Sequence, residues 1–166
     1  TTTENGVNEL AIELFAYQYA NNLPFHHFAM QQGSSPRMAK TWRDIPPVPI
    51  NAFKSVLLTC CPPDDIGRTF LTSGTTQDGV KGKSYHPTLD VYDKSMIKNF
   101  KNRFLPDTTT IKMGILFPDE VVMPNSSLAH YLNLALHNFG TPCSSYHLNT
   151  SGIEFENLFS DLRSSQ

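Results

Sequence analysis

The sequence predicts an α/β fold: a partial, mostly parallel sheet flanked by helices. In its second half, segments with helical periodicity alternate with short apolar runs, which is the pattern of strand–helix–strand units. The composition agrees, since 39% hydrophobic and 17% charged residues are typical of a globular domain. With 166 residues, the chain fits one α/β domain or the N-terminal fragment of a larger one. We expect a helix and a proline-rich strap over 1–54 and an α/β core over 55–166.

The first half begins with an expected helix. Apolar residues recur at helical spacing from Val7 to Phe15, and the helix should end before Pro24. His26 and His27 are then expected in a loop. A strap from Gly33 to Pro49 follows, because its "DIPPVPI" run favours extended backbone. Several apolar side chains should dock this strap and its continuation on a core: Trp42, Ile45, Val48, Ile50 and Phe53.

The expected core contains strands and helices in turn. Short β-prone runs predict strands at 55–59 and 69–73, and helical spacing from Leu89 to Phe104 predicts a helix that Pro106 stops. A buried strand is expected at 111–117.

The next helix has clear boundaries, with Asn125 or Ser126 as N-cap, an apolar run over 128–139, and Gly140 at its end. A strand at 143–148 and a final helix capped by Thr150 or Ser151 complete the pattern. Strands alternating with helices predict parallel pairing. A further strand would normally follow, so the sheet is expected to be unfinished at Gln166, leaving an edge that favours association.

Charge and hydropathy exclude several classes of function. A net charge of -2 without a long basic run argues against nucleic-acid binding. No apolar stretch approaches the roughly 20 residues that span a bilayer, and the N-terminus does not resemble a signal peptide, so we expect a soluble, cytoplasmic protein.

Cysteine and histidine spacing argues against a metal site or a disulfide framework. Cys60, Cys61 and Cys143 are expected to be reduced structural thiols. His130 and His137 could share a helix face, but no acidic partner stands at ligand spacing, so no metal site is predicted.

The most informative stretch is "FLTSGTTQDGVKGKSYH", from Phe70 to His86. Four hydroxyl residues surround one glycine, with two lysines behind them. Glycine lets successive backbone N–H groups approach an anion, and the hydroxyls add donors. A decorated turn is the simpler interpretation. A phosphate cradle would use the hydroxyl segment together with a charge from Lys81 or Lys83; neither G-x-x-x-x-G-K-[ST] nor G-x-G-x-x-G is present.

"TSGTT" after a strand, followed by a Lys-Gly pair and His86, resembles the phosphate loop of adenylate-forming enzymes. The order of "WRDIPPVPINAFKS", this loop and "ILFPDEVVMPNSSLAHYL" is similar to that in the acyl-protein synthetase (LuxE type) branch, near phenylacetate-CoA ligases. The resemblance covers residues 42–140. It implies a set of ATP-binding residues: Thr72, Ser73, Gly74, Thr75, Thr76, Lys81, Lys83 and His86. Ser126 and Ser127 match the "SSL" element and would lie near the acyl pocket, although a helix cap also explains them.

The resemblance implies activation of a carboxylic acid, expected to be a fatty acid, by ATP and Mg. The acid attacks the α-phosphate, pyrophosphate leaves and an acyl-adenylate forms. The acyl group then passes to a thiol with release of AMP, the acceptor being a protein cysteine, from which it moves on to a reductase, or coenzyme A. Gln77 stands where the family usually has glycine, and Lys81 comes one place late. No catalytic residue is identified, because the family's adenine site, catalytic lysine and acyl-accepting cysteine would lie beyond Gln166.

Two other interpretations stay open. In one, the same fold is an inactive scaffold or interaction domain, which Gln77 favours. In the other, the chain is an unrelated α/β hydrolase or transferase, but "TSGTT" lacks the two glycines of a nucleophile elbow.

Overall fold

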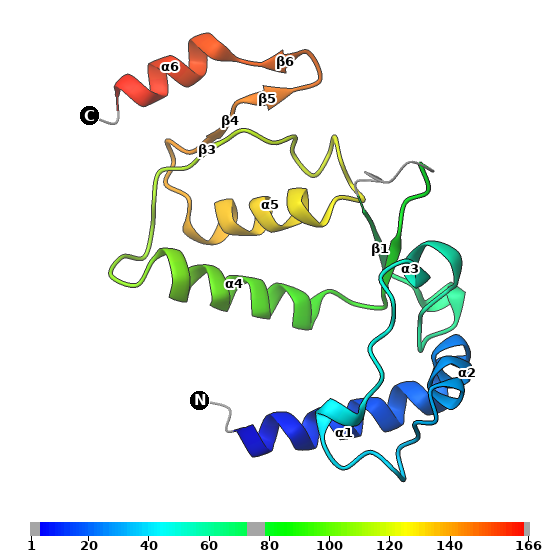
Figure 1. Cartoon of the computed structure of the whole chain (residues 1–166). Helices are drawn as coiled ribbons and strands as arrows, with labels where there is room; N and C mark the ends of the chain where they lie inside the picture. The colour runs from blue at the N-terminus through cyan, green and yellow to red at the C-terminus, as the bar shows by residue number, and fades with distance from the viewer. Residues whose placement is uncertain (1–3, 73–78, 165–166) are drawn as a thin grey trace. The chain divides into compact units, whose positions relative to one another are not determined.

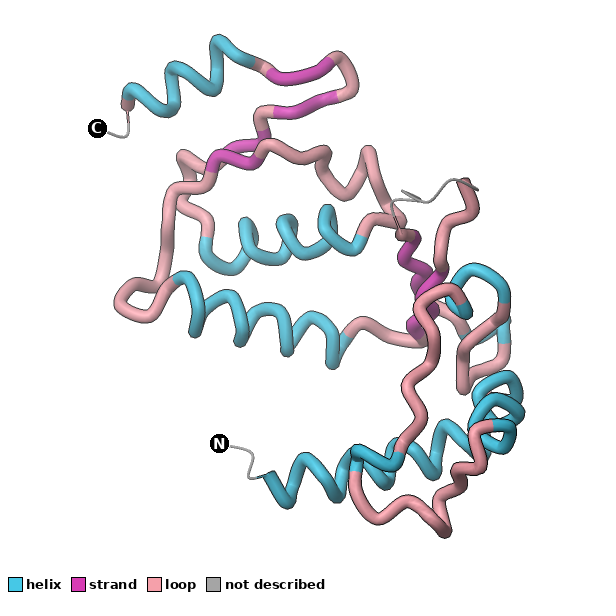
Figure 2. The backbone as a smooth tube through the Cα atoms, in the orientation of Figure 1, coloured by secondary structure: helices cyan, strands magenta, loops and turns pink. Residues whose placement is uncertain are grey.

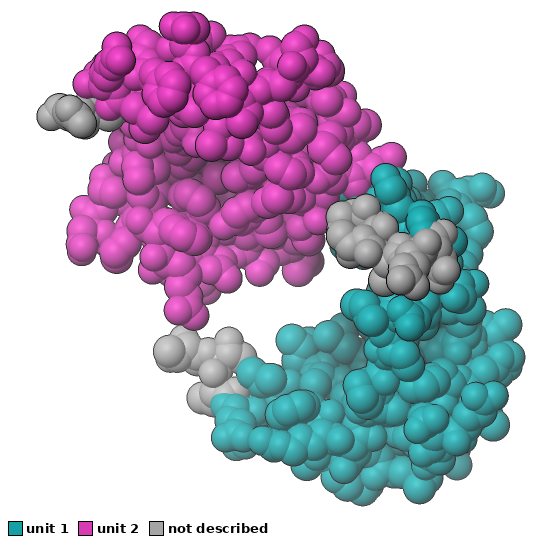
Figure 3. Space-filling view, turned by 45° about the horizontal axis from the view of Figure 1, so that its top comes forward, with its two compact units in different colours: residues 1–87 teal, residues 88–166 magenta. Residues whose placement is uncertain are grey.

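The computed structural model describes residues 4–72 and 79–164 and contains both helices and short strands (Figures 1 and 2). Two compact units divide the chain, residues 1–87 and 88–166 (Figure 3). This boundary separates two segments that each pack mainly within themselves. It does not test the expected change from strap to α/β core at residue 54, which stays a prediction. The described strands form three two-stranded sheets, of which one is parallel, rather than one mostly parallel sheet. The mixed helix and strand content agrees with the predicted class.

Unit 1 begins with two consecutive helices, α1 (Glu4–Asn21) and α2 (Leu23–Gln31). The first ends before Pro24, as expected. The second was not expected, and the prediction that His26 and His27 lie in a loop is wrong. Asn22 explains the restart, because its Oδ1 accepts a hydrogen bond from the Phe25 N–H at 3.1 Å. Pro24 stands in the first turn, where a missing N–H costs no helical hydrogen bond.

The core of unit 1 lies between these helices and the strap. Phe15, Phe25 and Ala29 are buried together with Ala39 of the strap, and Ile45 and Val48 pack against them. Docking of the strap is therefore confirmed for Ile45 and Val48. Trp42 and Ile50 are 44% and 78% exposed, so their predicted role in docking is wrong. Trp42 instead begins the short 3₁₀-helix η1 (Trp42–Asp44).

The remainder of unit 1 is α3 (Ala52–Ser55), the 3₁₀-helix η2 (Pro63–Asp65) and an antiparallel hairpin of β1 (Arg68–Leu71) and β2 (Lys83–His86). The strand expected at 55–59 is not formed. Ser55 ends α3, and Val56 is extended but pairs with no strand among residues 4–72 and 79–164. A β-prone run favours extended backbone, whereas a strand also needs a neighbour to pair with.

Unit 2 contains the predicted strand–helix–strand arrangement. Helix α4 (Asp90–Phe104) precedes β3 (Gly114–Ile115), α5 (Ser127–Phe139) and β4 (Ser145–Tyr146), and β3 and β4 pair in parallel. The strands are shorter than predicted because the second one is interrupted. Pro142 has no N–H to donate, and the Ser144 N–H turns back to the Thr141 carbonyl at 2.9 Å.

Unit 2 ends with a small hairpin and a helix. β5 (Leu148–Asn149) and β6 (Gly152–Ile153) pair antiparallel before α6 (Phe155–Arg163). The predicted cap at Thr150 or Ser151 is wrong, since both residues form the hairpin turn. Asn149 Oδ1 accepts from the Ser151 N–H at 2.7 Å, and Gly152 has a φ of 116°, which favours glycine. Across residues 4–72 and 79–164, the helices are too short or too polar to traverse a bilayer.

Candidate functional site

The hydroxyl-rich segment is the connection between β1 and β2. The Thr72 N–H donates to the Gly82 carbonyl at 2.9 Å, and the Gly82 N–H donates to Thr72 Oγ1 at 2.8 Å. These two bonds continue the ladder one pair beyond Leu71 and Lys83. We call this pair, Thr72 and Gly82, the neck. The predicted phosphate ligands Ser73, Gly74, Thr75 and Thr76 lie outside the described residues.

Gly82 suits the neck because its neighbours approach closely. A Cβ atom at this position would lie 3.1 Å from Thr72 Cγ2 and 3.5 Å from Phe53 Cβ. A larger side chain would therefore press on Thr72 from one side and on α3 from the other. Gly79 has a φ of 63°, which favours glycine, and no described atom lies within 4 Å of a Cβ at this position.

The two lysines lie beside the neck and are exposed. Lys81 immediately precedes Gly82, and Lys83 begins β2 opposite Leu71. Both residues therefore lie at the β2 end of the connection, where their charges could offset that of a bound anion.

His86 lies at the other end of the ladder. It pairs with Arg68, three residues from Lys83, which corresponds to about 10 Å along a strand. Its Nε2 is 2.9 Å from Ser84 Oγ, and its ring packs edge-on against Phe70 at 5.3 Å. Burial lowers the pKa of His86 below its usual 6.5, so the ring is neutral at pH 7. The hairpin thus places Thr72, Lys81 and Lys83 together and His86 away from them.

Ser126 and Ser127 belong to unit 2, where they begin α5. Ser126 is the N-cap, because its Oγ accepts from the Ala129 N–H at 3.2 Å. This confirms the capping interpretation for Ser126. A role near an acyl pocket stays a prediction for both serines.

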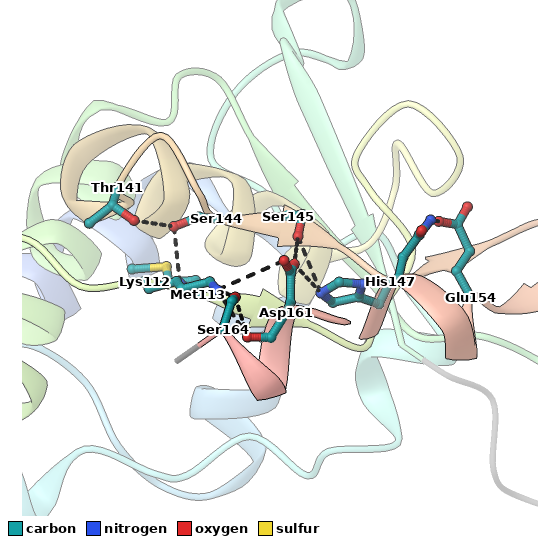
Figure 4. A network of polar contacts seen from close by, with 10 residues as sticks. Lys112, Met113, Thr141, Ser144, Ser145, His147, Glu154, Asp161 and Ser164 are labelled. Atoms are coloured by element: carbon teal, nitrogen blue, oxygen red, sulfur yellow. Dashed lines mark hydrogen bonds and ion pairs between the residues drawn. The ribbon is translucent and has the colours of Figure 1, made fainter. Parts of the chain in front are cut away.

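The structure also brings together a polar cluster that no sequence motif indicated (Figure 4). Ser145 Oγ donates to Asp161 Oδ2 at 2.8 Å, and His147 Nε2 lies 3.2 Å from each of these two atoms. Lys112 Nζ donates to the Asp161 carbonyl at 3.0 Å and lies 3.8 Å from Asp161 Oδ1. We call these four residues the clasp, since they hold α6 on β4.

The clasp contains Ser, His and Asp but not the geometry of a nucleophilic triad. A triad needs the carboxylate on one ring nitrogen and the serine on the other. Here both lie at His147 Nε2, and Nδ1 is buried without a partner in the part of the chain that the structure describes. No base is therefore positioned to activate Ser145. The clasp borders an open cavity of about 420 Å³, completed by Gly114, Leu158 and Leu162.

A second buried cluster centres on His130, which is 8% exposed. Its Nδ1 is 2.9 Å from Glu120 Oε1 and its Nε2 is 2.8 Å from Asp93 Oδ1. The imidazolium form can donate at both nitrogens, whereas the neutral ring donates at one only. The sequence contained no signal for this cluster, because Asp93 and Glu120 are 37 and 10 positions away. No group that could hold a metal ion occurs over residues 4–72 and 79–164.

The cysteines are free, as expected for reduced thiols. Burial, and to a lesser degree Cys61, raises the pKa of the Cys60 thiol. A raised pKa disfavours the nucleophilic thiolate, so Cys60 is not activated for acyl transfer.

No protein-family model matches the chain, and neither curated proteins nor solved structures include a match. The likeness to acyl-protein synthetases therefore stays a prediction that rests on the motifs.

Proposed function

We propose that this chain supplies the phosphate-binding part of an enzyme that activates a carboxylic acid with ATP, in the manner of the acyl-protein synthetase (LuxE type) branch of adenylate-forming enzymes. We also propose that this chain forms part of a larger, mostly parallel sheet, as in that family. The observation that carries it is the neck, where Thr72 and Gly82 tie the two ends of the hydroxyl-rich connection together.

The neck supports the proposal because it holds Thr72 beside Gly82 before any ligand arrives. A connection with tied ends loses less conformational entropy when its donors converge on a phosphate. Thr72 Oγ1 accepts from the Gly82 N–H, which leaves its own hydroxyl hydrogen available for a phosphate oxygen. Lys81 and Lys83 stand exposed beside it and would offset the charge.

The residues fit ATP in donor chemistry, but those that the structure describes in the connection offer no carboxylate for a metal ion. Mg²⁺ usually binds through nucleotide phosphates plus one or two carboxylates. The described part of the connection, Gly79 to Gly82, contains no carboxylate. The connection also contains Asp78, which lies outside the described residues. In this proposal Mg²⁺ enters with the nucleotide, and the adenine site and the acceptor thiol come from another segment or a partner protein.

Titration with magnesium pyrophosphate tests this proposal, with backbone amide signals as the readout. We expect shifts at Thr72, Lys81 and Gly82. Thr75→Val should weaken binding at least tenfold, because one hydrogen bond to a charged group contributes about 1.5–3 kcal/mol. Lys98→Ala, an exposed lysine of α4, is the matched control for Lys81→Ala and should bind as the unchanged protein does.

The second candidate function is a scaffold of the same fold without nucleotide binding. Its support is Gln77 in the loop and the packing of His86 against Phe70, away from the neck. Silence of the amide signals at saturating pyrophosphate would favour this candidate and reject the first.

A further inference from the structure

Cys60 and Cys61 are adjacent free thiols in the segment of unit 1 between α3 and η2. Both are half-buried, and the chain bends at these two residues. In an extended strand, neighbouring side chains point to opposite faces, which would separate the two sulfur atoms. The bend removes this alternation. The electrostatic effect of Cys61, which contributes to the raised pKa of Cys60, agrees with two thiols that lie near each other.

The hydroxyl group of Thr59 makes the two thiols unequal. Thr59 Oγ1 lies 3.0 Å from Cys61 Sγ and accepts a hydrogen bond from the Cys61 N–H at 3.2 Å. Since the N–H uses a lone pair of this oxygen, the hydroxyl hydrogen remains to donate, and the sulfur is a closer acceptor than the Cys61 carbonyl at 3.5 Å. A hydrogen bond to a charged acceptor is stronger than one to a neutral acceptor, so Thr59 favours the thiolate of Cys61. Burial, in contrast, disfavours the thiolate of Cys60.

We propose that Cys60 and Cys61 form a redox-sensitive dithiol, which a peroxide converts reversibly into a disulfide between the two neighbours. The Cys61 thiolate attacks one oxygen of hydrogen peroxide, the O–O bond breaks, and hydroxide leaves and takes up a proton to become water. Cys61 is then a sulfenic acid. The Cys60 sulfur attacks the Cys61 sulfur, the S–O bond breaks, and the hydroxyl group leaves with the Cys60 proton as a second water. Two thiols thus lose two electrons, which reduce one peroxide to two water molecules.

The spacing of the two residues makes this disulfide easy to reduce again. Consecutive Cα atoms lie about 3.8 Å apart across a trans peptide bond, whereas the Cα atoms of disulfides are usually about 4.4–6.8 Å apart. A disulfide between neighbours is therefore strained, and strained disulfides have higher reduction potentials than structural ones. The pair suits a reversible switch rather than a permanent cross-link.

Oxidation with hydrogen peroxide, followed by alkylation of the remaining thiols and mass spectrometry of peptide 55–68, tests the proposal. We expect this peptide to lose two hydrogen atoms and to escape alkylation, and a thiol reductant should restore both thiols. The measurement is made in Cys143→Ser, because the exposed third thiol could link two copies of the chain. A disulfide between two copies would overturn the proposal, as would a peptide 55–68 that keeps both thiols under conditions that oxidise Cys143 in the unchanged protein.

Two cysteine variants test which thiol reacts with the peroxide. Cys60→Ser removes the second thiol, so a sulfenic acid should accumulate on Cys61 and be captured by dimedone. Cys61→Ser leaves the thiol whose thiolate is disfavoured, so its oxidation at Cys60 should be at least tenfold slower. Equal rates of oxidation in the two variants would contradict the assigned order of reaction.

A substitution of Thr59 tests the role of its hydroxyl group. Thr59→Val keeps the shape of the side chain and should slow disulfide formation about threefold or more. One hydrogen bond to a charged group favours the thiolate about tenfold or more, and about half of this effect on a logarithmic scale reaches the rate, because a stabilised thiolate is a weaker nucleophile. Thr59→Ser keeps a hydroxyl group and should react as the unchanged protein does.

An undiminished rate in Thr59→Val would reject this role of Thr59 and with it the proposed activation of Cys61. None of these measurements involves a nucleotide. The proposed function and the dithiol can therefore fail independently, since pyrophosphate would leave the Thr72 and Gly82 amides unaffected in the first case, and peroxide would leave peptide 55–68 unchanged in the second.

Discussion

Helices α5 and α6 belong to the same compact unit but are attached to it in different ways. α5 buries Ala129, Ala135 and Phe139 and packs on α4, where the Phe139 ring stacks on Phe100 at 5.3 Å. α6 has no buried residue. Its Phe155, Phe159 and Leu162 are 56%, 53% and 56% exposed, and the clasp supplies its polar contacts to β4.

The difference shows that an amphipathic sequence does not imply a covered apolar face. α6 has the apolar spacing of a packed helix at 155, 159 and 162, yet that stripe meets solvent. Apolar burial contributes about 25 cal/mol per Å², while exposed ion pairs contribute little. We therefore expect α5 to be stably attached and α6 to be the weaker element, and three substitutions test this.

The largest effect is expected from Phe139→Ala. Removing this ring from the α4–α5 contact should cost about 3–5 kcal/mol, the usual range for a buried phenylalanine. Phe159→Ala in α6 is the matched control and should cost less than about 0.5 kcal/mol. Denaturant-dependent hydrogen exchange of unit 2 amides measures both, because the single tryptophan, Trp42, reports on unit 1. Equal losses would show that α6 is packed as firmly as α5.

A smaller effect is expected from His130→Gln. The substitution removes the ring whose two nitrogens contact Asp93 and Glu120, carboxylates that are 31% and 22% exposed. Removing one partner of a fully buried pair costs about 3–5 kcal/mol, so partial exposure suggests about 2–3 kcal/mol here. His137→Gln changes an exposed histidine of the same helix and should be neutral within about 0.5 kcal/mol. The same hydrogen-exchange experiment measures the free energy of unfolding of both variants. If His130→Gln leaves it unchanged, water replaces the ring without loss of stability.

The smallest effect concerns the clasp and depends on pH. The Ser145 hydroxyl lowers the pKa of Asp161, with Lys112 and His147 adding to this and burial opposing it. A lowered folded-state pKa means that the carboxylate stabilises the fold above its ordinary value of 3.8 and that this contribution disappears as the pH falls through the lowered pKa.

Acid should therefore lower the protection of the α6 amides from hydrogen exchange, relative to their intrinsic exchange rate at each pH, before it lowers that of the α5 amides. In the Asp161→Asn variant, the α6 amides should already be weakly protected at neutral pH, and their protection should no longer fall with acid. Asp107→Asn, an exposed aspartate outside the clasp, should retain it. If α6 in Asp161→Asn behaves as in the unchanged protein at every pH, the clasp does not hold the helix.

Prediction from the sequence succeeded where the signals were local. Ser126 and Gly140 marked the ends of α5 because a cap contacts backbone within three or four residues. Pro24 marked the end of α1, although Asn22 restarted the chain as α2. The hydroxyl-rich stretch was recognised as a connection after a strand, and the neck agrees with that position.

Prediction failed where distant segments had to meet. The clasp joins Lys112, Ser145 and Asp161, and its first and last members are 49 positions apart. Residues 55–59 have strand composition but no partner, while Leu148 and Ile153 pair with each other. Neither the clasp nor the unpaired run at 55–59 has a short-range signal, because each depends on which groups arrive from elsewhere. The hairpin at 148–153 does have one in Asn149 and Gly152, but the prediction placed a helix cap there.

The amino-acid order alone therefore specified the end of α1, both ends of α5 and a fold that mixes helices and strands, since helix ends depend on contacts within about one helical turn. Folding in three dimensions decided which strands pair, which apolar faces are covered, and where histidines meet carboxylates. A polar group is satisfied by whichever partner lies near it after collapse, and collapse is driven by apolar area that has no preferred direction.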